Sequence, residues 1–559
     1  MDIVFYRTHV VTKGEKMDSI KRVILVFTMS MTLIVTNAMG DISTGLKQVL
    51  LDTDPHTIKH QPIMRNFYAT YGYRPLWITS QNFKKEKIKS LLNRIKRDPT
   101  LSHSGYIYKE MNNISHILKG TLNQKSALKL ELRLTALYYE FLQHSIYGEI
   151  DWKGFNSYLK EKKEKSDIDG KWINYAPRFD IMNLLAQDSI DKTIESVKPK
   201  HYRYQNLVDA LPRLYDIQRR GGWKKLTNIK NLKLWKRRAT VPLLRERLKI
   251  SGDYKSCKKN FTGVVFDRCL DKALKHFQNR HGLVPNGIVD TSTQNALNQT
   301  VWQKINTVLL NIDRIKWLPR EKGSRYIIVN IPDFMLSYIE DYKVKKTLKV
   351  IVGKPTHPTP IFSNKISYIV LNPYWKIPES IVRKEVVPAM IKNPNYIKRK
   401  GIEVHKTWEE NSSIMPIDDI VWSDYLKEDK KFPYRLMNPP GPRNALGKIK
   451  FKFPNRFNVY LHDTPNKKLF NRNSRAFSHG CIRLHKPQSL LTAISTVDNS
   501  INLPEAQQIL RGKNKETIHI DQKIPIHLVY LTAGVNPQNE LIFRDDIYRY
   551  DKEQKRTVR

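Results

Sequence analysis

The spacing of apolar residues divides the chain into a helical N-terminal part and a β-rich C-terminal part. From about Pro55 to Trp235, apolar residues recur three and four positions apart, which predicts an α-helical scaffold. The clearest run comprises Leu132, Leu134, Leu137, Tyr138, Phe141, Leu142 and Ile146. An aromatic group around Phe67, Tyr68 and Trp77 is expected in the helical core, and a sugar-binding groove is the alternative.

A second region, about Thr240 to Asn298, carries the start and stop signals of three short helices. Thr240 and Pro242 open the first helix, and Asp267 begins the second, which Gly282 closes. Asp290 caps the third. We therefore expect a small three-helix module here.

Beyond Arg325 the apolar pattern becomes that of β-strands. The runs Tyr326–Ile331, Leu348–Val352 and Ile366–Leu371 are rich in β-branched residues and are separated by turn residues. Between Lys376 and Phe432 the strands give way to a polar, partly helical stretch. A segment of this length inside a β-domain is more typical of a functional lid than of a structureless loop.

The first forty residues have the pattern of a secretory signal. Lys21 and Arg22 precede an apolar run over residues 23–35, and small residues follow at 38–40. Met17 begins a more conventional signal and is a candidate for the true start. The alternative is an uncleaved anchor, although the run is short for a membrane span. In both cases the remainder is expected outside the cytoplasm.

Composition and charge narrow the classes of function. The 559 residues leave room for several domains, and 40% apolar residues exclude a disordered basic tail. The formal net charge is +44, but Lys and Arg are scattered, with neither zinc-finger spacing nor an RNA-stacking signature. We expect a solvated basic surface that meets envelope polyanions, and no nucleic-acid partner.

Three cysteines give two different expectations. Cys257 and Cys269 lie twelve residues apart in the three-helix module. They either form a disulfide or are two ordinary buried cysteines, and the sequence does not decide between these alternatives. Cys481 stands alone, and His462 precedes it at the end of the apolar run Phe457–Leu461, which is expected to be a strand.

The residues around Cys481 are those that a thiol acyl-transfer site requires. A cysteine attacks as its thiolate, so it needs a base such as His462 within reach. Gly480 permits a tight turn from which the amides of Gly480 and Cys481 can face an oxyanion. Arg483 can hold a carboxylate, or it can form a structural salt bridge. His479 is expected to shape the turn rather than to transfer a proton.

His462-Asp-Thr-Pro465 and Ser478-His-Gly-Cys-Ile-Arg483 together resemble the active-site signature of the L,D-transpeptidase (YkuD-fold) catalytic domain. Residues 440–447 and 525–530 support the resemblance. The three-helix region, with residues 281–290 and 293–297, resembles a peptidoglycan-binding module. The whole chain is similar to the large multidomain periplasmic branch of YcbB type.

The resemblance implies Cys481 as nucleophile, His462 as base, the backbone carbonyl of Asp463 as the group that orients the imidazole, and Gly480 as a backbone oxyanion donor. Ser478, His479 and Arg483 are the expected substrate-binding residues. The implied reaction releases D-Ala from tetrapeptide stems through a cysteine thioester and forms 3→3 cross-links in peptidoglycan. Carbapenem acylation, periplasmic localisation, partnership with other cell-wall enzymes and independence from metals and cofactors are also implied.

Several alternatives stay open at this stage. The protein could attach an envelope protein or a D-amino acid to the stem, hydrolyse the thioester, or serve as a non-catalytic wall-binding scaffold. His462, His479, Cys481 and His485 could ligate zinc, but no His-Glu-x-x-His helix occurs. Residues 353–356 superficially resemble a phosphate loop, but the first glycine is missing, so a phosphate loop is rejected.

The expected architecture is multidomain α+β. It consists of a signal (residues 1–40), an α-helical scaffold (41–237), the peptidoglycan-binding-like module (238–300), a linker (301–324), a mostly-β catalytic domain (325–535) with a lid at about 376–432, and a C-terminal tail (536–559).

Overall fold

The computed structural model describes residues 42–52, 59–79, 82–201, 203–255, 257, 263–426, 430–554 and 556. The expected signal over residues 1–40, with its alternative start at Met17, lies outside them. Within these ranges no helix has the length and apolar character needed to span a bilayer. The described residues form two compact units: those up to Lys84 together with 112–134, and 85–111 together with those from Thr135 onward.

The first unit is helical. It contains α1 (Ile42–Asp52) and α2 (Gln61–Thr70), the end of α4 (Tyr106–Ile117) and the start of α5 (Gln124–Tyr147). Phe67, Tyr68 and Trp77 are fully buried, so their predicted place in the core is confirmed. The Glu131 carboxylate lies among them and accepts hydrogen bonds from the Tyr68 hydroxyl (2.7 Å) and the Trp77 amide (2.9 Å).

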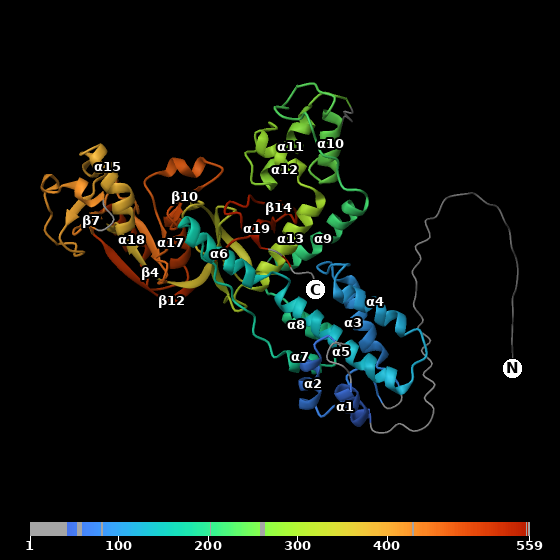
Figure 1. The fold of residues 1–559 in the computed structure, drawn as a ribbon. Helices are drawn as coiled ribbons and strands as arrows, with labels where there is room; N and C mark the ends of the chain where they lie inside the picture. The colour runs from blue at the N-terminus through green and yellow to red at the C-terminus, as the bar shows by residue number, and fades with distance from the viewer. Residues whose placement is uncertain are drawn as a thin grey trace, which may run out of the picture. The chain divides into compact units, whose positions relative to one another are not determined.

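The helices of the second unit pack partly against its sheet. They include α3 (Lys85–Arg97), α6 (Trp152–Ser166), α7 (Ile181–Ala186), α8 (Ile190–Val197), α9 (Tyr204–Arg219) and α13 (Val301–Lys316) (Figure 1). The predicted linker over 301–324 is wrong, because most of it is α13. Its apolar face, with Ile305, Val308 and Ile312, packs with α9 against β1 (Arg325–Asn330). Thr300 begins α13 with a capping box.

The three-helix module is confirmed with the predicted caps. Its helices are α10 (Val241–Ile250), α11 (Arg268–Arg280) and α12 (Thr291–Asn298). The Asp267 side chain accepts hydrogen bonds from two amides of α11, and Asp290 caps α12. A disulfide joins Cys257 to Cys269, with their Cα atoms 6.4 Å apart. The pairing that the sequence left open is therefore present in the structure.

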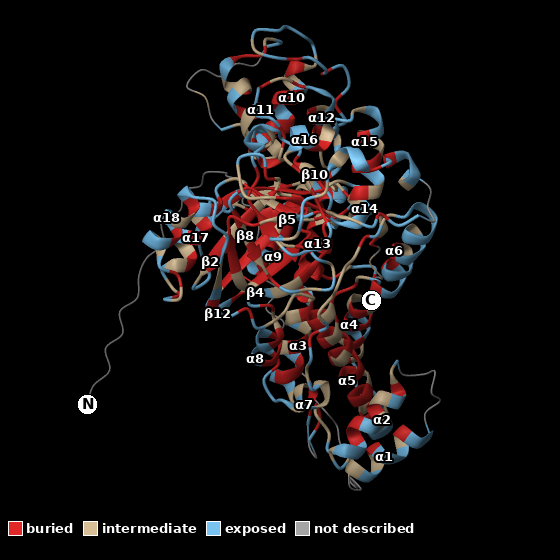
Figure 2. Ribbon diagram, turned by 90° about the vertical axis from the view of Figure 1, so that its left-hand side faces the viewer, coloured by how far each residue is buried: buried red, intermediate tan, exposed pale blue. Residues whose placement is uncertain are grey.

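One sheet dominates the C-terminal half and closes on itself. Its order is β10-β3-β11-β9-β8-β4-β12-β1-β2, and β2 also pairs with β3. The further strands are β2 (Met335–Glu340), β3 (Lys343–Gly353), β4 (Phe362–Leu371), β8 (Ile449–Lys452), β9 (Leu461–His462), β10 (Ala476–Ser478), β11 (Ile482–Leu484) and β12 (Glu516–Val529). The three predicted strand runs lie in β1, β3 and β4. Figure 2 shows these strands largely in red, as buried residues.

The last residues complete this domain rather than trailing from it. α17 (Pro487–Ser495) and α18 (Leu503–Arg511) precede β12, and β13 (Ala533–Val535), β14 (Leu541–Phe543) and α19 (Tyr550–Glu553) follow it. Tyr548 and Tyr550 are buried in the same hydrophobic cluster as the sheet. The predicted tail over 536–559 is therefore wrong, because its aromatic side chains close the core.

The predicted lid is a small folded subdomain. It has the sheet β5-β7-β6, made of Trp375–Lys376, Arg435–Asn438 and Glu403–His405. Between these strands lie α14 (Glu379–Ile381), the π-helix η1 (Val382–Val386), α15 (Val387–Lys392), α16 (Tyr396–Lys400) and the 3-10 helices η2 (Ile417–Asp419) and η3 (Trp422–Leu426). Val387, Ile397 and Leu436 belong to its own hydrophobic core.

Candidate active site

The Cys481 loop is held by hydrogen bonds from within and from its neighbours. The Ser478 hydroxyl donates to the Cys481 carbonyl (2.5 Å) and accepts from the Gly480 amide (3.2 Å). Thr359 donates to the Gly480 carbonyl (2.8 Å). Gly480 has φ +109°, a conformation that favours glycine. Ser478 is buried, so its hydroxyl shapes the loop that presents Cys481.

His462 is fixed in one tautomer. Its Nδ1 lies 2.5 Å from the backbone carbonyl of Asp463, and a carbonyl only accepts, so Nδ1 carries the proton. Nε2 is then the basic nitrogen. The Asp463 carboxylate accepts from the Lys448 amide (2.9 Å) and contacts Lys467, which anchors the residue whose carbonyl orients the ring.

Strand register places these groups on one face. β9 and β11 run parallel with Arg483 opposite His462, and Lys450 of β8 is opposite His462 on its other side. The alternating residues Leu461 and Ile482 point into the apolar core. Cys481 directly precedes β11, and its thiol interacts electrostatically with Lys450 and Arg483, the two residues opposite His462. We therefore place it on the face that His462 and Arg483 share.

The Cys481 sulfur contacts the Asn458 carbonyl rather than His462. Cys481 is partly accessible, and its thiol lies 3.7 Å from the Asn458 carbonyl, to which it donates. Among the hydrogen bonds of the described residues, none joins it to His462. The expected His462–Cys481 bond is therefore absent at rest, and the thiol must turn toward Nε2 before it transfers its proton.

Both partners are uncharged at neutral pH. Burial raises the pKa of the Cys481 thiol, while Tyr460 and Lys450 act in the opposite direction. Burial, and next the Arg483 charge, lower the pKa of His462 to about 3. The resting pair is thus a thiol beside a neutral imidazole rather than an ion pair.

Sequence reasoning missed three residues of this face: Tyr460, Lys450 and Lys452. The Lys450 ammonium lies 4.0 Å from the Tyr460 ring centre, and the Tyr460 and His462 rings meet edge to face at 5.6 Å. Burial and then Lys452 lower the pKa of Lys450 to about 8. The alternation of Lys450 and Lys452 about Phe451 was the signal that could have revealed them.

Arg483 and the loop amides supply the positive side of the site. The Arg483 Nε is buried without a hydrogen-bond partner, and none of the described carboxylates forms an ion pair with this side chain. The structural salt bridge considered for Arg483 is thus not present in that part of the chain. The Gly480 amide is engaged by Ser478, whereas the Cys481 amide meets no acceptor among the described residues, so Cys481 offers the available oxyanion donor.

His479 connects the loop to the lid subdomain. Its Nε2 lies 2.5 Å from the Glu385 carboxylate on the π-helix η1 and 3.4 Å from the Lys354 ammonium. The His357 ring packs edge-on against it at 5.0 Å. This placement gives His479 a contact with the lid subdomain. Over the described residues, no three His, Cys, Asp or Glu side chains gather into a metal-binding group.

The strand before His462 is shorter than predicted. β9 covers only Leu461–His462, whereas the sequence favoured a strand from Phe457. The Asn455 side chain accepts hydrogen bonds from the amides of Phe457 (3.0 Å) and Val459 (3.2 Å), and Asn458 has φ +54°. These local bonds replace strand pairing and deliver the Asn458 carbonyl to the thiol.

Comparison with known proteins gives three family matches. Residues 324–501 match the YkuD family, described as the L,D-transpeptidase catalytic domain; residues 62–211 match a scaffold domain; and residues 237–297 match the "Putative peptidoglycan binding domain". A curated protein of Haemophilus influenzae, named "Putative L,D-transpeptidase", is 32% identical over 244 residues. That match covers 44% of this chain and 48% of the relative, so the chain spans about half the relative's length.

Two solved structures were also found. L,D-transpeptidase structures from Stackebrandtia nassauensis and Xylanimonas cellulosilytica are 13% and 12% identical, with TM-scores of 0.21 and 0.16. Each match covers 54% of this chain, and 97% and 98% of the respective structures. At these TM-scores neither structure adds to the assignment.

Proposed function

We propose that this protein is a cysteine-dependent L,D-transpeptidase that remodels peptidoglycan, because residues 324–501 match the L,D-transpeptidase catalytic domain family and residues 237–297 match the putative peptidoglycan-binding domain family. The observation that carries the proposal is the shared face of Cys481, His462 and Arg483. It combines a nucleophile, a base of fixed tautomer and a cation without a carboxylate partner among the described residues.

Acylation begins when the Cys481 thiol turns from the Asn458 carbonyl toward His462. Nε2 accepts the thiol proton as sulfur attacks the carbonyl that joins the third residue of a tetrapeptide stem to D-Ala. The Cys481 amide, which meets no acceptor in the described chain, stabilises the oxyanion. The carbon–nitrogen bond then breaks, the imidazolium returns its proton to the leaving amine, and D-Ala departs from a thioester.

Arg483 and Lys450 favour this sequence through their charges. They stabilise the thiolate and attract substrate carboxylates, whereas the Arg483 charge disfavours a lasting imidazolium. A neutral His462 is therefore ready to accept a proton, and an imidazolium beside Arg483 readily gives it back. The buried site makes these interactions stronger than they are in water.

Transfer completes the cycle. The side-chain amine of a neighbouring stem attacks the thioester, His462 takes its proton, and the thiol is restored as the 3→3 amide forms. A protein amine, a D-amino acid or water can take the place of this acceptor. The lid subdomain contacts the loop through Glu385 and His479, and this contact supports a role for it in limiting water. Carbapenems would acylate the same sulfur.

The proposed location is the periplasm, with residues 1–40 as export signal and other cell-wall enzymes as partners. The basic charge of the chain suits a polymer rich in carboxylates.

The test is Cys481→Ala in the full chain, incubated with defined tetrapeptide muropeptides. We expect D-Ala release and the acyl-enzyme mass to disappear, while binding to isolated sacculi stays within about twofold, because the sulfur forms the covalent bond between the enzyme and the stem. Mass spectrometry of the wild-type products identifies the acceptor. D-Ala release at the wild-type rate by the variant would contradict the assignment.

A further inference from the structure

A second cavity lies away from the Cys481 face, between the three-helix module, α9, α13 and the β13–β14 hairpin. Its volume is about 340 Å³, which is the size of a small ligand. Trp223, Phe277 and Phe543 supply aromatic walls, and the charged lining residues are Asp209, Arg213, Arg247, Arg280, Lys304 and Glu540. Of these, Arg247, Lys304 and Glu540 come from three different parts of the chain.

Arg247 is a buried cation with unmet donors. The residue is 2% exposed, and its Nε donates to the Leu297 carbonyl at 3.1 Å. Both Nη atoms are buried without a hydrogen-bond partner. The guanidinium lies 3.6 Å from the centre of the Trp223 ring. Leaving buried charged donors unsatisfied is costly, so this arrangement calls for an acceptor.

Lys304 is a second buried cation in the same cavity. It is 3% exposed, and its ammonium donates to His281 Nε2 at 2.9 Å. His281 Nδ1 donates to the Phe277 carbonyl, so the imidazole is neutral and does not balance the charge. Burial, and next the Arg247 charge, hold the pKa of Lys304 well below its usual value. The Arg247 guanidinium and the Lys304 amine thus disfavour each other's charge, and a bound anion would favour both charges.

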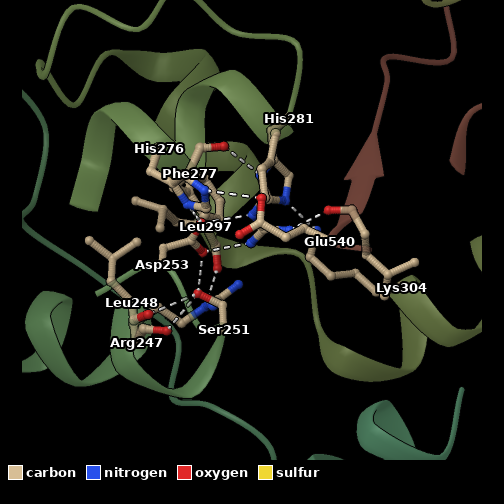
Figure 3. Close-up of polar contacts among 12 residues, drawn as sticks. Arg247, Leu248, Ser251, Asp253, His276, Phe277, His281, Leu297, Lys304 and Glu540 are labelled. Atoms are coloured by element: carbon tan, nitrogen blue, oxygen red, sulfur yellow. Dashed lines mark hydrogen bonds and ion pairs between the residues drawn. The ribbon is translucent and has the colours of Figure 1, made fainter. Parts of the chain in front are cut away.

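Asp253, the carboxylate that acts electrostatically on both Arg247 and Lys304, is already committed. Asp253 pairs with Arg280 (2.6 Å) and His276 (2.8 Å) and accepts from the Ser251 hydroxyl (2.6 Å). Figure 3 shows Asp253 near Ser251 and His276, with His281, Glu540 and Lys304 in the same cluster. No described carboxylate forms an ion pair with Arg247 or Lys304. The cavity lining carries four Arg or Lys side chains against the two carboxylates Asp209 and Glu540, so it is short of negative charge.

Glu540 gives the cavity a second pole. Its Oε2 contacts His276 (3.2 Å) and accepts from Asn536 (2.9 Å), whereas Oε1 has no partner among the described residues. A ligand that carries a cation beside its anion fits this arrangement. A phosphate, by contrast, would bring additional negative charge toward Glu540.

We infer that this cavity binds a small α-amino carboxylate, with its carboxylate on Arg247 and Lys304, its ammonium toward Glu540 and its side chain among the aromatic rings. The two Nη atoms match the two oxygens of a carboxylate. Such a ligand can be a free amino acid, including the D-Ala that the proposed reaction releases, or the amino-acid end of a stem peptide. Binding does not require Cys481, so the Cys481→Ala protein binds equally well.

Calorimetry and thermal unfolding of the full chain with D-alanine, D-alanine methyl ester, inorganic phosphate and a tetrapeptide muropeptide test this site. D-alanine or the tetrapeptide binds and raises the unfolding midpoint, and which of them binds identifies the source. The methyl ester, which lacks the carboxylate, does not. Lys304→Met and Arg247→Met each weaken binding roughly 30-fold or more.

The unliganded variants separate a binding role from a structural one. Lys304→Met replaces the buried amine at similar volume, so the ligand response of this variant is compared with its own ligand-free midpoint, and that response is lost. The control Lys275→Met on α11, whose ammonium pairs with Asp271 away from the cavity, keeps the response. The proposal is overturned by unchanged affinity in both cavity variants, by phosphate as the sole ligand, or by no response to any α-amino carboxylate.

Discussion

At the scale of single residues, the site depends on how burial sets the protonation of a thiol and an imidazole. His462 is 5% exposed and holds its proton on Nδ1 through the Asp463 carbonyl. Arg483, on the neighbouring strand, disfavours a second proton. Proton transfer therefore accompanies attack by sulfur instead of preceding it, as general-base catalysis requires.

Between pH 5 and pH 7.5 the protonation of His462 should not change, so the acylation rate should show no acid limb in this range. With a pKa of about 3, His462 remains neutral at pH 5, so the rate there should stay within about twofold of its value at pH 7. An imidazole of ordinary pKa would lose about 30-fold by pH 5. The measurement is the pH profile of kcat/KM for D-Ala release.

Arg483→Gln provides the matched control for this profile. Removing the guanidinium charge raises the pKa of His462, so the acid limb should move toward higher pH, with KM also raised if Arg483 holds a substrate carboxylate. A wild-type acid limb near 6.5 would show that the resting imidazole is not protected as described.

At the scale of elements, helix caps and buried ion pairs fix the three-helix module. The Asp267 carboxylate accepts from the amides of Cys269 (2.8 Å) and Leu270 (2.9 Å), and it pairs with Arg245 at 2.7 Å. Both charged side chains are almost fully buried. The Asp267 carboxylate thus both caps α11 and neutralises the buried Arg245 guanidinium.

Asp267→Ala should destabilise this module far more than Asp290→Ala. The first change leaves Arg245 buried and unpaired, which costs about 3–5 kcal/mol. The second removes a single N-cap bond, which costs about 1 kcal/mol. In Asp267→Ala, the loss of about 3–5 kcal/mol should accelerate hydrogen exchange of the α11 amides in the full chain a hundredfold or more. In Asp290→Ala, the α12 amides should exchange only several-fold faster. Equal exchange in the two variants would contradict the role given to Arg245.

At the scale of the whole molecule, several imidazoles are buried in neutral form. Burial is the first cause that lowers the pKa of His462 and His527, each to about 3, and of His201 and His281, both well below the ordinary value. The unfolded chain binds protons at these residues near pH 6.5, whereas the folded chain does not. Stability is therefore complete above pH 6.5 and falls as the pH decreases toward 3.

Acid should destabilise the second unit steeply below pH 6.5. Each of these histidines contributes a slope that approaches about 1.4 kcal/mol per pH unit between its two pKa values. The thermal midpoint should drop between pH 7 and 5, and His527→Asn should make the drop shallower. A midpoint that stays constant over this range would contradict the neutral burial of these groups.

Local signals in the sequence were sufficient for much of this protein. Asp267 and Asp290 marked helix starts correctly because a cap depends on one side chain and the next few amides. The apolar runs of β1, β3 and β4 could be recognised in the sequence because the residues on one or both faces of each strand are buried. The motifs around His462 and Cys481 identified the chemistry because residue type and spacing define it.

Other features were decided only by the tertiary structure. Residues 301–324 and 536–559 were assigned to a linker and a tail, yet α13 and Tyr550 are buried, because the surfaces that cover them are distant in sequence. Tyr460 and Lys450 come close to Cys481 only because of the pairing of their strands, and this register cannot be predicted from a local sequence pattern. The sequence determines which groups can react and where helices begin. The tertiary structure decides which side chains share a face and which charged groups are buried away from water. It thereby sets the protonation states of the buried side chains.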